Sequence, residues 1–215
     1  MSRRAAQPHL PPQQRPAAVP RGDVFTAPAA GRRLPVRSAP VATGGTRPAW
    51  LFVAAHGGTG ARLLAELSWQ RYEAARRDGN LAGPGYGMCA GRAWPDPVLE
   101  PTGDVVVVCR SSMRGLAWAQ DAAAQHLAGH TPPLHVRGLV VIADGPGKPG
   151  RPRSAAAALL AGVYPAVWPV PWVADYQLLS RRPGEGCPPC HPAVADVLDD
   201  IRRSLLEGNP DAHLA

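Results

Sequence analysis

The stretch VAAHGGTGARLL, residues 53–64, joins the end of an apolar run to a glycine-rich turn and then to a helix-forming segment. The apolar run AWLFVAA, residues 49–55, is short and bounded by proline and glycine, which predicts a buried strand. Residues 61–77 contain good helix formers with a periodic set of apolar side chains, and they predict a helix. A phosphate-binding loop requires this order, because glycines let the backbone approach an anion and the first N–H groups of the helix point at it.

The rest of the chain alternates between the same two kinds of segment. Further strands are predicted at 104–109, 136–144 and 166–172, and further helices at 113–129, 153–162 and 192–208. The connection 79–103 is rich in glycine and proline, and no strand is predicted there. Buried strands that alternate with helices indicate an α/β fold, with a small, mostly parallel sheet flanked by helices. We expect one domain over residues 48–208, between an N-terminal tail (1–47) and a short C-terminal tail (209–215).

The positive charge of the chain is concentrated near its amino terminus. The formal net charge is +7, and residues 1–50 hold eight arginines, nine prolines and a single acidic residue, whereas residues 51–215 are balanced. A segment of this composition buries too little apolar surface to offset its ordering entropy, so residues 1–47 are expected to be disordered and dispensable for folding. Two interpretations of the tail stay open, a solvated leader and a weak contact with nucleic acid through its arginines.

Neither a membrane span nor an export signal is predicted. The sequence has no run of about 18 apolar residues, the length that a spanning helix needs. The paired arginines at positions 3 and 4 are not followed by the apolar stretch of a secretion signal. We therefore expect a cytoplasmic protein.

The segment CPPCH, residues 187–191, matches the sequence patterns of both the haem attachment motif and the redox C-x-x-C motif. Haem attachment requires export, for which the sequence carries no signal. A zinc site needs four ligands, and Cys187, Cys190 and His191 supply three. We expect a loop that holds neither haem nor zinc, with a zinc, redox or haem role as the alternatives.

The loop HGGTGAR, residues 56–62, resembles the deviant Walker A loop of the ParA/MinD family of P-loop ATPases, K-G-G-x-G-K-[ST]. Residues 104–129, 138–147 and 167–179 look like later segments of that family in the same order, so the similarity covers about residues 50–180. The resemblance implies a P-loop NTPase-like fold that binds ATP or ADP. The residues that it implies for nucleotide binding are His56, Gly57, Gly58, Thr59, Gly60, Ala61 and Arg62.

The positions that carry the chemistry of that family are changed. His56 stands at the signature lysine, Ala61 at the second lysine, and Arg62 at the hydroxyl residue that holds Mg²⁺. The central strand of the family, which ends in a Mg²⁺-binding aspartate, is not recognisable, and Asp144 is the alternative for that aspartate. Phosphoryl transfer depends on these cations and on Mg²⁺. We therefore expect weak binding of ATP or ADP without hydrolysis.

Three functional hypotheses follow. The first is a degenerate ParA/MinD-like protein that binds a nucleotide or phosphate as a regulatory module, by analogy in plasmid, chromosome or mobile-element maintenance. The second is an active but atypical ATPase with a borrowed cation. Its candidate cations are His56, Arg62, Arg110 and Lys148. The third is an α/β interaction scaffold that binds no nucleotide.

Overall fold

The computed structural model describes residue 28 and residues 30–41, 48–79, 85–100, 102–177 and 188–207. They form an α/β fold with a single sheet of five parallel strands in the order β2-β1-β3-β4-β5. The strands are β1 (Trp50–Ala54), β2 (Gly87–Gly91), β3 (Asp104–Arg110), β4 (His135–Ile142) and β5 (Val167–Val170). The helices are the short 3-10 helix η1 (Ala30–Arg32), α1 (Ala61–Arg77), α2 (Met113–Leu127), α3 (Arg151–Ala161), α4 (Ala174–Gln177) and α5 (Pro192–Glu207). The predicted fold class is confirmed.

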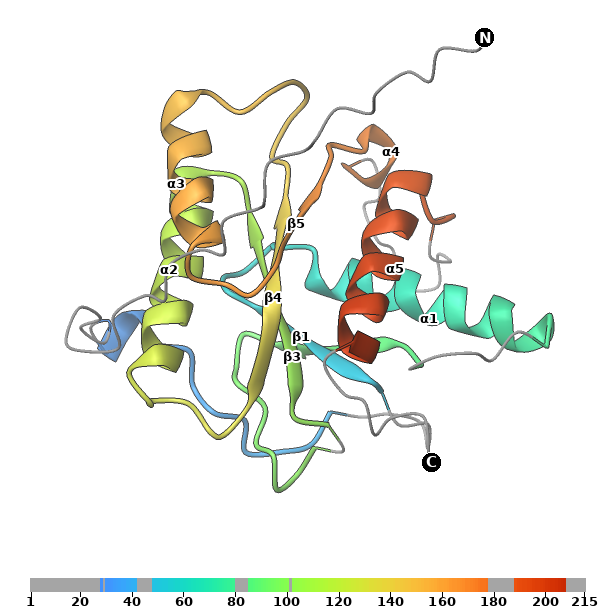
Figure 1. Ribbon diagram of the computed structural model, residues 1–215, viewed down its shortest axis with the longest axis horizontal. Coiled ribbons are helices and arrows are strands. Elements are labelled where there is room, and N and C mark those ends of the chain that lie inside the picture. Colours follow the sequence, from blue (N-terminus) through green and yellow to red (C-terminus); the bar gives the residue numbers. More distant parts are fainter. Residues whose placement is uncertain are drawn as a thin grey trace, which may run out of the picture.

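Helices cover both faces of the sheet. α2 and α3 lie on one face, and α1 and α5 lie on the other (Figure 1). Side chains of β3 alternate between the two cores, with Val105 and Val107 packed on the α2 side and Val106 and Val108 on the α1 side. The unbroken valine run follows from this arrangement, because a strand between two helical layers needs apolar side chains on both faces.

The strand order places a crevice at the carboxyl ends of β1 and β3. From β1 the chain passes through α1 to β2 on one side, whereas from β3 it passes through α2 to β4 on the other side. Because crossover connections are right-handed, this change of direction puts α1 and α2 on opposite faces of the sheet. Ligands of open parallel sheets bind at such a point. The glycine-rich turn between β1 and α1 lies there.

The prediction that residues 79–103 contain no strand is wrong. β2 lies within this connection and pairs in parallel with β1, at the edge of the sheet. Its sequence, GMCAG, has no apolar run, and it packs closely through small residues instead. A side chain at Gly87 would run into the rings of Trp50 and Phe52. Hydrophobicity therefore gives no signal for this strand, whose position is set by its hydrogen bonds to β1.

The prediction that the whole of residues 1–47 is a disordered tail is also wrong, because residues 30–41 pack on the domain. The side chain of Gln125 accepts a hydrogen bond from the N–H of Leu34 at 2.9 Å and donates one to its carbonyl oxygen at 2.8 Å. Leu34 and Val41 are 2% and 8% exposed and belong to the core on the α2 side. The domain therefore begins well before its predicted boundary.

Three arginines of the predicted tail are held by the domain or by their own segment. Arg32 forms an ion pair with Asp121 of α2, and Arg33 donates a hydrogen bond to a nearby carbonyl oxygen. Arg37 donates to the carbonyl oxygen of Ala90 at 2.8 Å, at the end of β2. The other five arginines of the predicted tail lie outside the described residues. The alternative interpretation of the tail, a weak contact with nucleic acid, thus stays a prediction that concerns these five arginines.

Two predictions near the carboxyl terminus fall partly or wholly outside the described residues. Cys187 and the predicted C-terminal tail, residues 209–215, are not among them, whereas Cys190 precedes α5 as a half-buried free thiol. Among the helices that the structure describes, none is both long and apolar enough to cross a membrane. No three His, Cys, Asp or Glu side chains gather as a metal site within the described ranges.

Candidate anion-binding site

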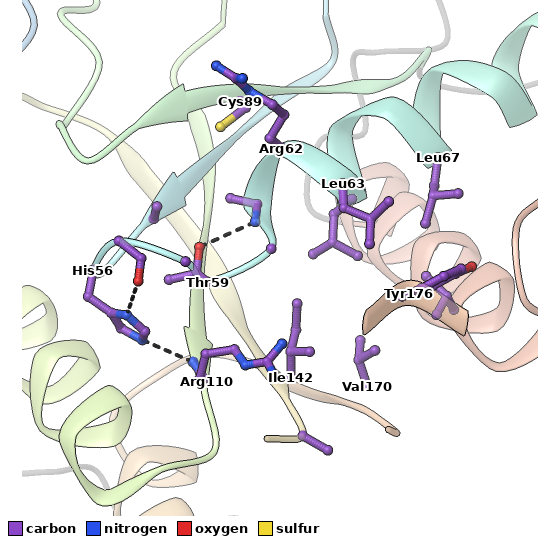
Figure 2. A pocket seen from close by; sticks show the side chains of 18 of the residues that line it. His56, Thr59, Arg62, Leu63, Leu67, Cys89, Arg110, Ile142, Val170 and Tyr176 are labelled. Atoms are coloured by element: carbon purple, nitrogen blue, oxygen red, sulfur yellow. Dashed lines mark hydrogen bonds between the residues drawn. The ribbon is translucent and has the colours of Figure 1, made fainter. Parts of the chain in front are cut away.

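The glycine-rich loop at the end of β1 lines a cavity of about 470 Å³ (Figure 2). Seven of the eight residues predicted for the nucleotide site line it, and they are the residues of the loop, namely His56, Gly57, Gly58, Thr59, Gly60, Ala61 and Arg62. Two of them need to be glycine, since φ is 75° at Gly58 and 92° at Gly60. A Cβ atom at Gly60 would also lie 2.9 Å from the side chain of Ile142. The predicted loop is therefore brought together on one wall of a cavity, in a conformation that depends on its glycines.

The amino terminus of α1 lies at this cavity and has no capping side chain. Gly60 occupies the N-cap position, and the first turn contains no acidic residue. The first N–H groups of a helix lack partners within the helix and carry partial positive charge, so they suit an external anion. One of them is already in use, because the N–H of Ala61 donates to Oγ1 of Thr59 at 3.3 Å. The first turn of α2, in contrast, is capped by Ser112.

His56 holds the loop in place through interactions of both ring nitrogens. Its Nε2 accepts a hydrogen bond from the backbone N–H of Arg110 at 3.2 Å, and its Nδ1 lies 2.7 Å from the carbonyl oxygen of Gly57. Since a carbonyl oxygen only accepts, the proton is on Nδ1, and the arrangement suits a neutral ring. Gly115 allows this contact, because a Cβ atom there would lie 3.0 Å from Nε2 of His56. His56 thus joins β1 to β3 and α2 and offers no charge to the cavity.

Arg110 and Asp144 form an ion pair at the ends of β3 and β4. Nε of Arg110 lies 2.7 Å from Oδ1 of Asp144, and the two side chains are 16% and 30% exposed. Burial acts to raise the pKa of Asp144, but the hydrogen bond and charge of Arg110, with hydrogen bonds from Ser112, outweigh it and lower the pKa. Arg110 lines the cavity, whereas the predicted Asp144 does not. Asp144 therefore affects the charge of the cavity only through its ion pair with Arg110.

Two further arginines line the cavity, and the lysine considered for it does not. Arg62 follows the loop in the first turn of α1 and is exposed to solvent. Arg92 comes from the segment after β2, and its guanidinium lies 5.3 Å from the ring centroid of Trp118. Lys148 is exposed on the segment between β4 and α3 and is not among the lining residues. The positive charge near the loop therefore comes from arginines.

The side of the cavity away from His56 is apolar. Leu63 and Leu67 of α1 face it together with Tyr176 of α4 (Figure 2). Val170, Val173 and Val194 complete this wall. The hydroxyl of Tyr176 donates to the carbonyl oxygen of Pro189 at 3.1 Å and accepts from the N–H of His191 at 2.6 Å. A polar loop and an apolar wall thus share one cavity.

Two cysteines near the site differ in accessibility. Cys89 of β2 is partly exposed and, like Arg62, lines the cavity (Figure 2). Cys109 of β3 is fully buried, and burial, helped by the charge of Asp144, raises the pKa of its thiol to about 12. Because the thiolate is the reactive form, Cys109 is inert in the folded protein.

Sequence patterns identified the loop but not the residues that complete its cavity. Cys89, Arg92 and Tyr176 come from segments that are distant in sequence and meet only in the folded sheet. Arg110, which the sequence already offered as a candidate cation, does line the cavity, and its position directly after a buried parallel strand is the signal for it. No family model, no curated protein and no solved structure matches this chain.

Proposed function

We propose that the chain is a degenerate ParA/MinD-like P-loop protein that binds a nucleotide or another phosphorylated ligand without hydrolysing it. The observation that carries the proposal is the uncapped amino terminus of α1, which meets a glycine loop inside a cavity at the point where the sheet changes direction. Its volume of about 470 Å³ lies within the range of small-molecule sites, about 300–1,000 Å³. By analogy with the family, the bound state would regulate a partner in plasmid, chromosome or mobile-element maintenance.

The distribution of charge supports binding without hydrolysis. Catalysis of phosphoryl transfer requires cations that are aimed at the charge developing in the transition state. His56 is engaged as a neutral brace, and the guanidinium of Arg110 is already paired with a carboxylate. Arg62 remains for ligand charge, but it is exposed, and solvent screens it. We therefore expect a dissociation constant of about 10–100 µM for ADP, which corresponds to weak binding.

The scaffold hypothesis keeps one observation in its favour. Met113 and Leu159 are 51% and 74% exposed, and they line a small apolar groove between α2 and α3. Exposed apolar side chains of this kind are typical of surfaces that bind other proteins. The groove lies on the opposite face of the sheet from α1 and is independent of the glycine loop.

Thermal shift with ATP and ADP, each with and without Mg²⁺, tests the proposal when it is combined with an assay of phosphate release. Ligands that bind the folded state alone raise the melting temperature with concentration. We expect a rise with both nucleotides, little dependence on Mg²⁺, and phosphate release at the background rate. Turnover that depends on Mg²⁺ would favour the atypical ATPase. An unchanged melting temperature with every nucleotide would favour the scaffold.

A further inference from the structure

A second cavity lies between α1 and α5, which cross in Figure 1, and we call it the α1–α5 cavity. Its volume is about 520 Å³, and its described lining residues are all different from those of the loop cavity. Trp50, the first residue of β1, lines it, whereas the glycine loop follows the last residue of that strand. On α1, residues up to Leu67 line the loop cavity and residues from Ser68 onward line the second one. The two cavities therefore lie at opposite ends of β1.

An ion pair between the two helices holds one arginine in the wall of the α1–α5 cavity. Nη2 of Arg71 lies 2.7 Å from Oδ1 and 2.6 Å from Oδ2 of Asp199, and both residues line the cavity. The contact uses one nitrogen of the guanidinium. Nε and Nη1 of Arg71 have no partner among the described residues, so they remain available to a ligand. Asp199 thus fixes the position of a donor group without using all of its N–H groups.

Positive charge exceeds negative charge in the lining of this cavity. Three arginines line it, Arg71, Arg202 and Arg203, and Asp199 is the one acidic residue of the described lining. Arg203 is exposed and pairs with Asp200 at 2.6 Å. Arg202 is half-buried and has no ion-pair or hydrogen-bond partner within the described ranges. Because a guanidinium presents a planar fork of donors, it fits the paired oxygens of a carboxylate or phosphate.

The floor of the α1–α5 cavity is apolar and aromatic. Trp50 and Leu198 are 1% and 4% exposed, and the partly buried Tyr72 and Leu206 lie beside them in the lining. Nε1 of Trp50 is a buried donor without a partner in the described part of the chain, whereas buried donors are usually paired with protein or water. A volume of about 520 Å³ exceeds what a bare oxyanion fills and lies within the range of organic ligands, about 300–1,000 Å³.

We propose that the α1–α5 cavity binds a small organic anion. Arg71 and Arg202 hold its carboxylate or phosphate, and its uncharged body lies on Tyr72 and on the floor formed by Trp50 and Leu198. The inference is independent of the proposed function, since the two cavities share no described lining residue. Both the charge and the body of the ligand contribute to binding, and changes at the glycine loop leave this binding intact.

Titration of the full chain at low salt, followed by nuclear magnetic resonance, tests the chemistry of the ligand. The probes are benzoate, phenyl phosphate, inorganic phosphate and the uncharged benzyl alcohol. We expect benzoate or phenyl phosphate to bind about tenfold or more tightly than both of the other probes, and the tighter of the two identifies the anionic group. Equal binding of inorganic phosphate would overturn the role of the floor. Equal binding of benzyl alcohol would overturn the role of the arginines, and no binding of either organic anion would overturn the proposal.

Matched variants locate the bound anion. Arg202→Gln and Arg153→Gln each remove one positive charge, the first from this cavity and the second from an exposed position on α3. We expect Arg202→Gln to weaken the organic anion about fivefold or more, and Arg153→Gln to leave its affinity within about twofold. Equal losses in the two variants would reduce the binding to an effect of net charge and overturn the proposal.

A third variant separates this cavity from the glycine loop. Gly57→Asp places a carboxylate at the loop cavity, and we expect the affinity for the organic anion to stay within about twofold of the parent. A loss as large as that of Arg202→Gln would place the anion at the glycine loop and overturn the second site. Arg202→Gln breaks no ion pair between described residues, and thermal melts of each variant check that it folds.

Discussion

Replacing Gly115 with alanine tests the contact on which the glycine loop is built. Gly115 lies in the first turn of α2, where a Cβ atom would overlap the backbone carbonyl oxygen of Arg110 and lie 3.0 Å from Nε2 of His56. Neither neighbour can move freely. The backbone of β3 is fixed by pairing with β1 and β4, and both ring nitrogens of His56 are engaged. The variant must therefore push α2 away from the sheet or displace the imidazole.

The size of the effect follows from two opposing contributions to the free energy of unfolding. Overpacking in a core costs about 1–3 kcal/mol, and the upper end applies because the overlapping atom belongs to the backbone. Alanine in place of glycine within a helix contributes about 1 kcal/mol in the other direction. The net destabilisation is about 2 kcal/mol, which lowers the melting temperature of a domain of this size by about 4–8 °C.

Thermal melts followed by circular dichroism measure this difference, with Gly103→Ala as the matched control. A Cβ atom at Gly103 would meet no heavy atom within 4 Å, and its φ is outside the positive range. The control should therefore melt within about 2 °C of the parent, because the substitution adds no clash. A melting temperature of Gly115→Ala equal to or above that of the parent would refute the close approach of α2 to the loop.

Four further predictions concern the segment before the domain, the ion pair and the thiols. A chain starting at Pro48 should melt about 10 °C or more below the parent, because it loses two buried apolar side chains worth about 1.5–3 kcal/mol each; an unchanged melting temperature would contradict the packing of residues 30–41. Asp144→Asn should strengthen pyrophosphate binding by about three- to tenfold in calorimetry, since Arg110 loses its partner, whereas weaker binding would show that the carboxylate serves the ligand. Because folding lowers the pKa of Asp144, its ionised carboxylate stabilises the protein at pH values above the unfolded pKa of about 4. The difference in free energy of unfolding between the parent and Asp144→Asn should therefore disappear as the pH falls below that value. Alkylation at neutral pH, followed by peptide mapping, should modify Cys89 and leave Cys109 unmodified until unfolding, and ADP should slow the reaction of Cys89; rapid modification of Cys109 would contradict its burial.

Local periodicity accounts for what the sequence predicted well. The helix predicted at 61–77 has the same bounds in the structure, because its apolar stripe, its glycine start and its Asp-Gly end are all local signals. The valine run 104–109 marks a strand that is buried on both faces. The glycine loop was identified for the same reason, since a strand, a turn and a helix follow one another within a few residues.

Long-range contacts account for what the sequence did not predict. β2 is held by hydrogen bonds to β1, and the segment 30–41 is held by residues such as Gln125 that lie far along the chain. Nothing in the composition of either segment signals these partners. The pairing of Arg110 with Asp144 likewise depends on the register between β3 and β4. Proximity created by sheet order is not encoded in local patterns, so the cavity could be predicted at its loop but not at its other walls.

Placing a negatively charged side chain at position 57 tests most directly whether the glycine loop binds an anion. Gly57 is exposed and lines the cavity, its φ is outside the positive range, and a Cβ atom there would meet nothing within 4 Å. Aspartate and asparagine therefore fit equally well, and they differ in charge alone. The measurement is the dissociation constant of ADP for Gly57→Asp and Gly57→Asn, determined by calorimetry at low salt. At about 4 Å and an effective dielectric constant near 20, two unit charges interact by about 4 kcal/mol, so a carboxylate beside the phosphates should weaken binding at least tenfold even after screening. The account predicts that loss for Gly57→Asp and an affinity within about threefold of the parent for Gly57→Asn, whereas equal affinities in the two variants would contradict it.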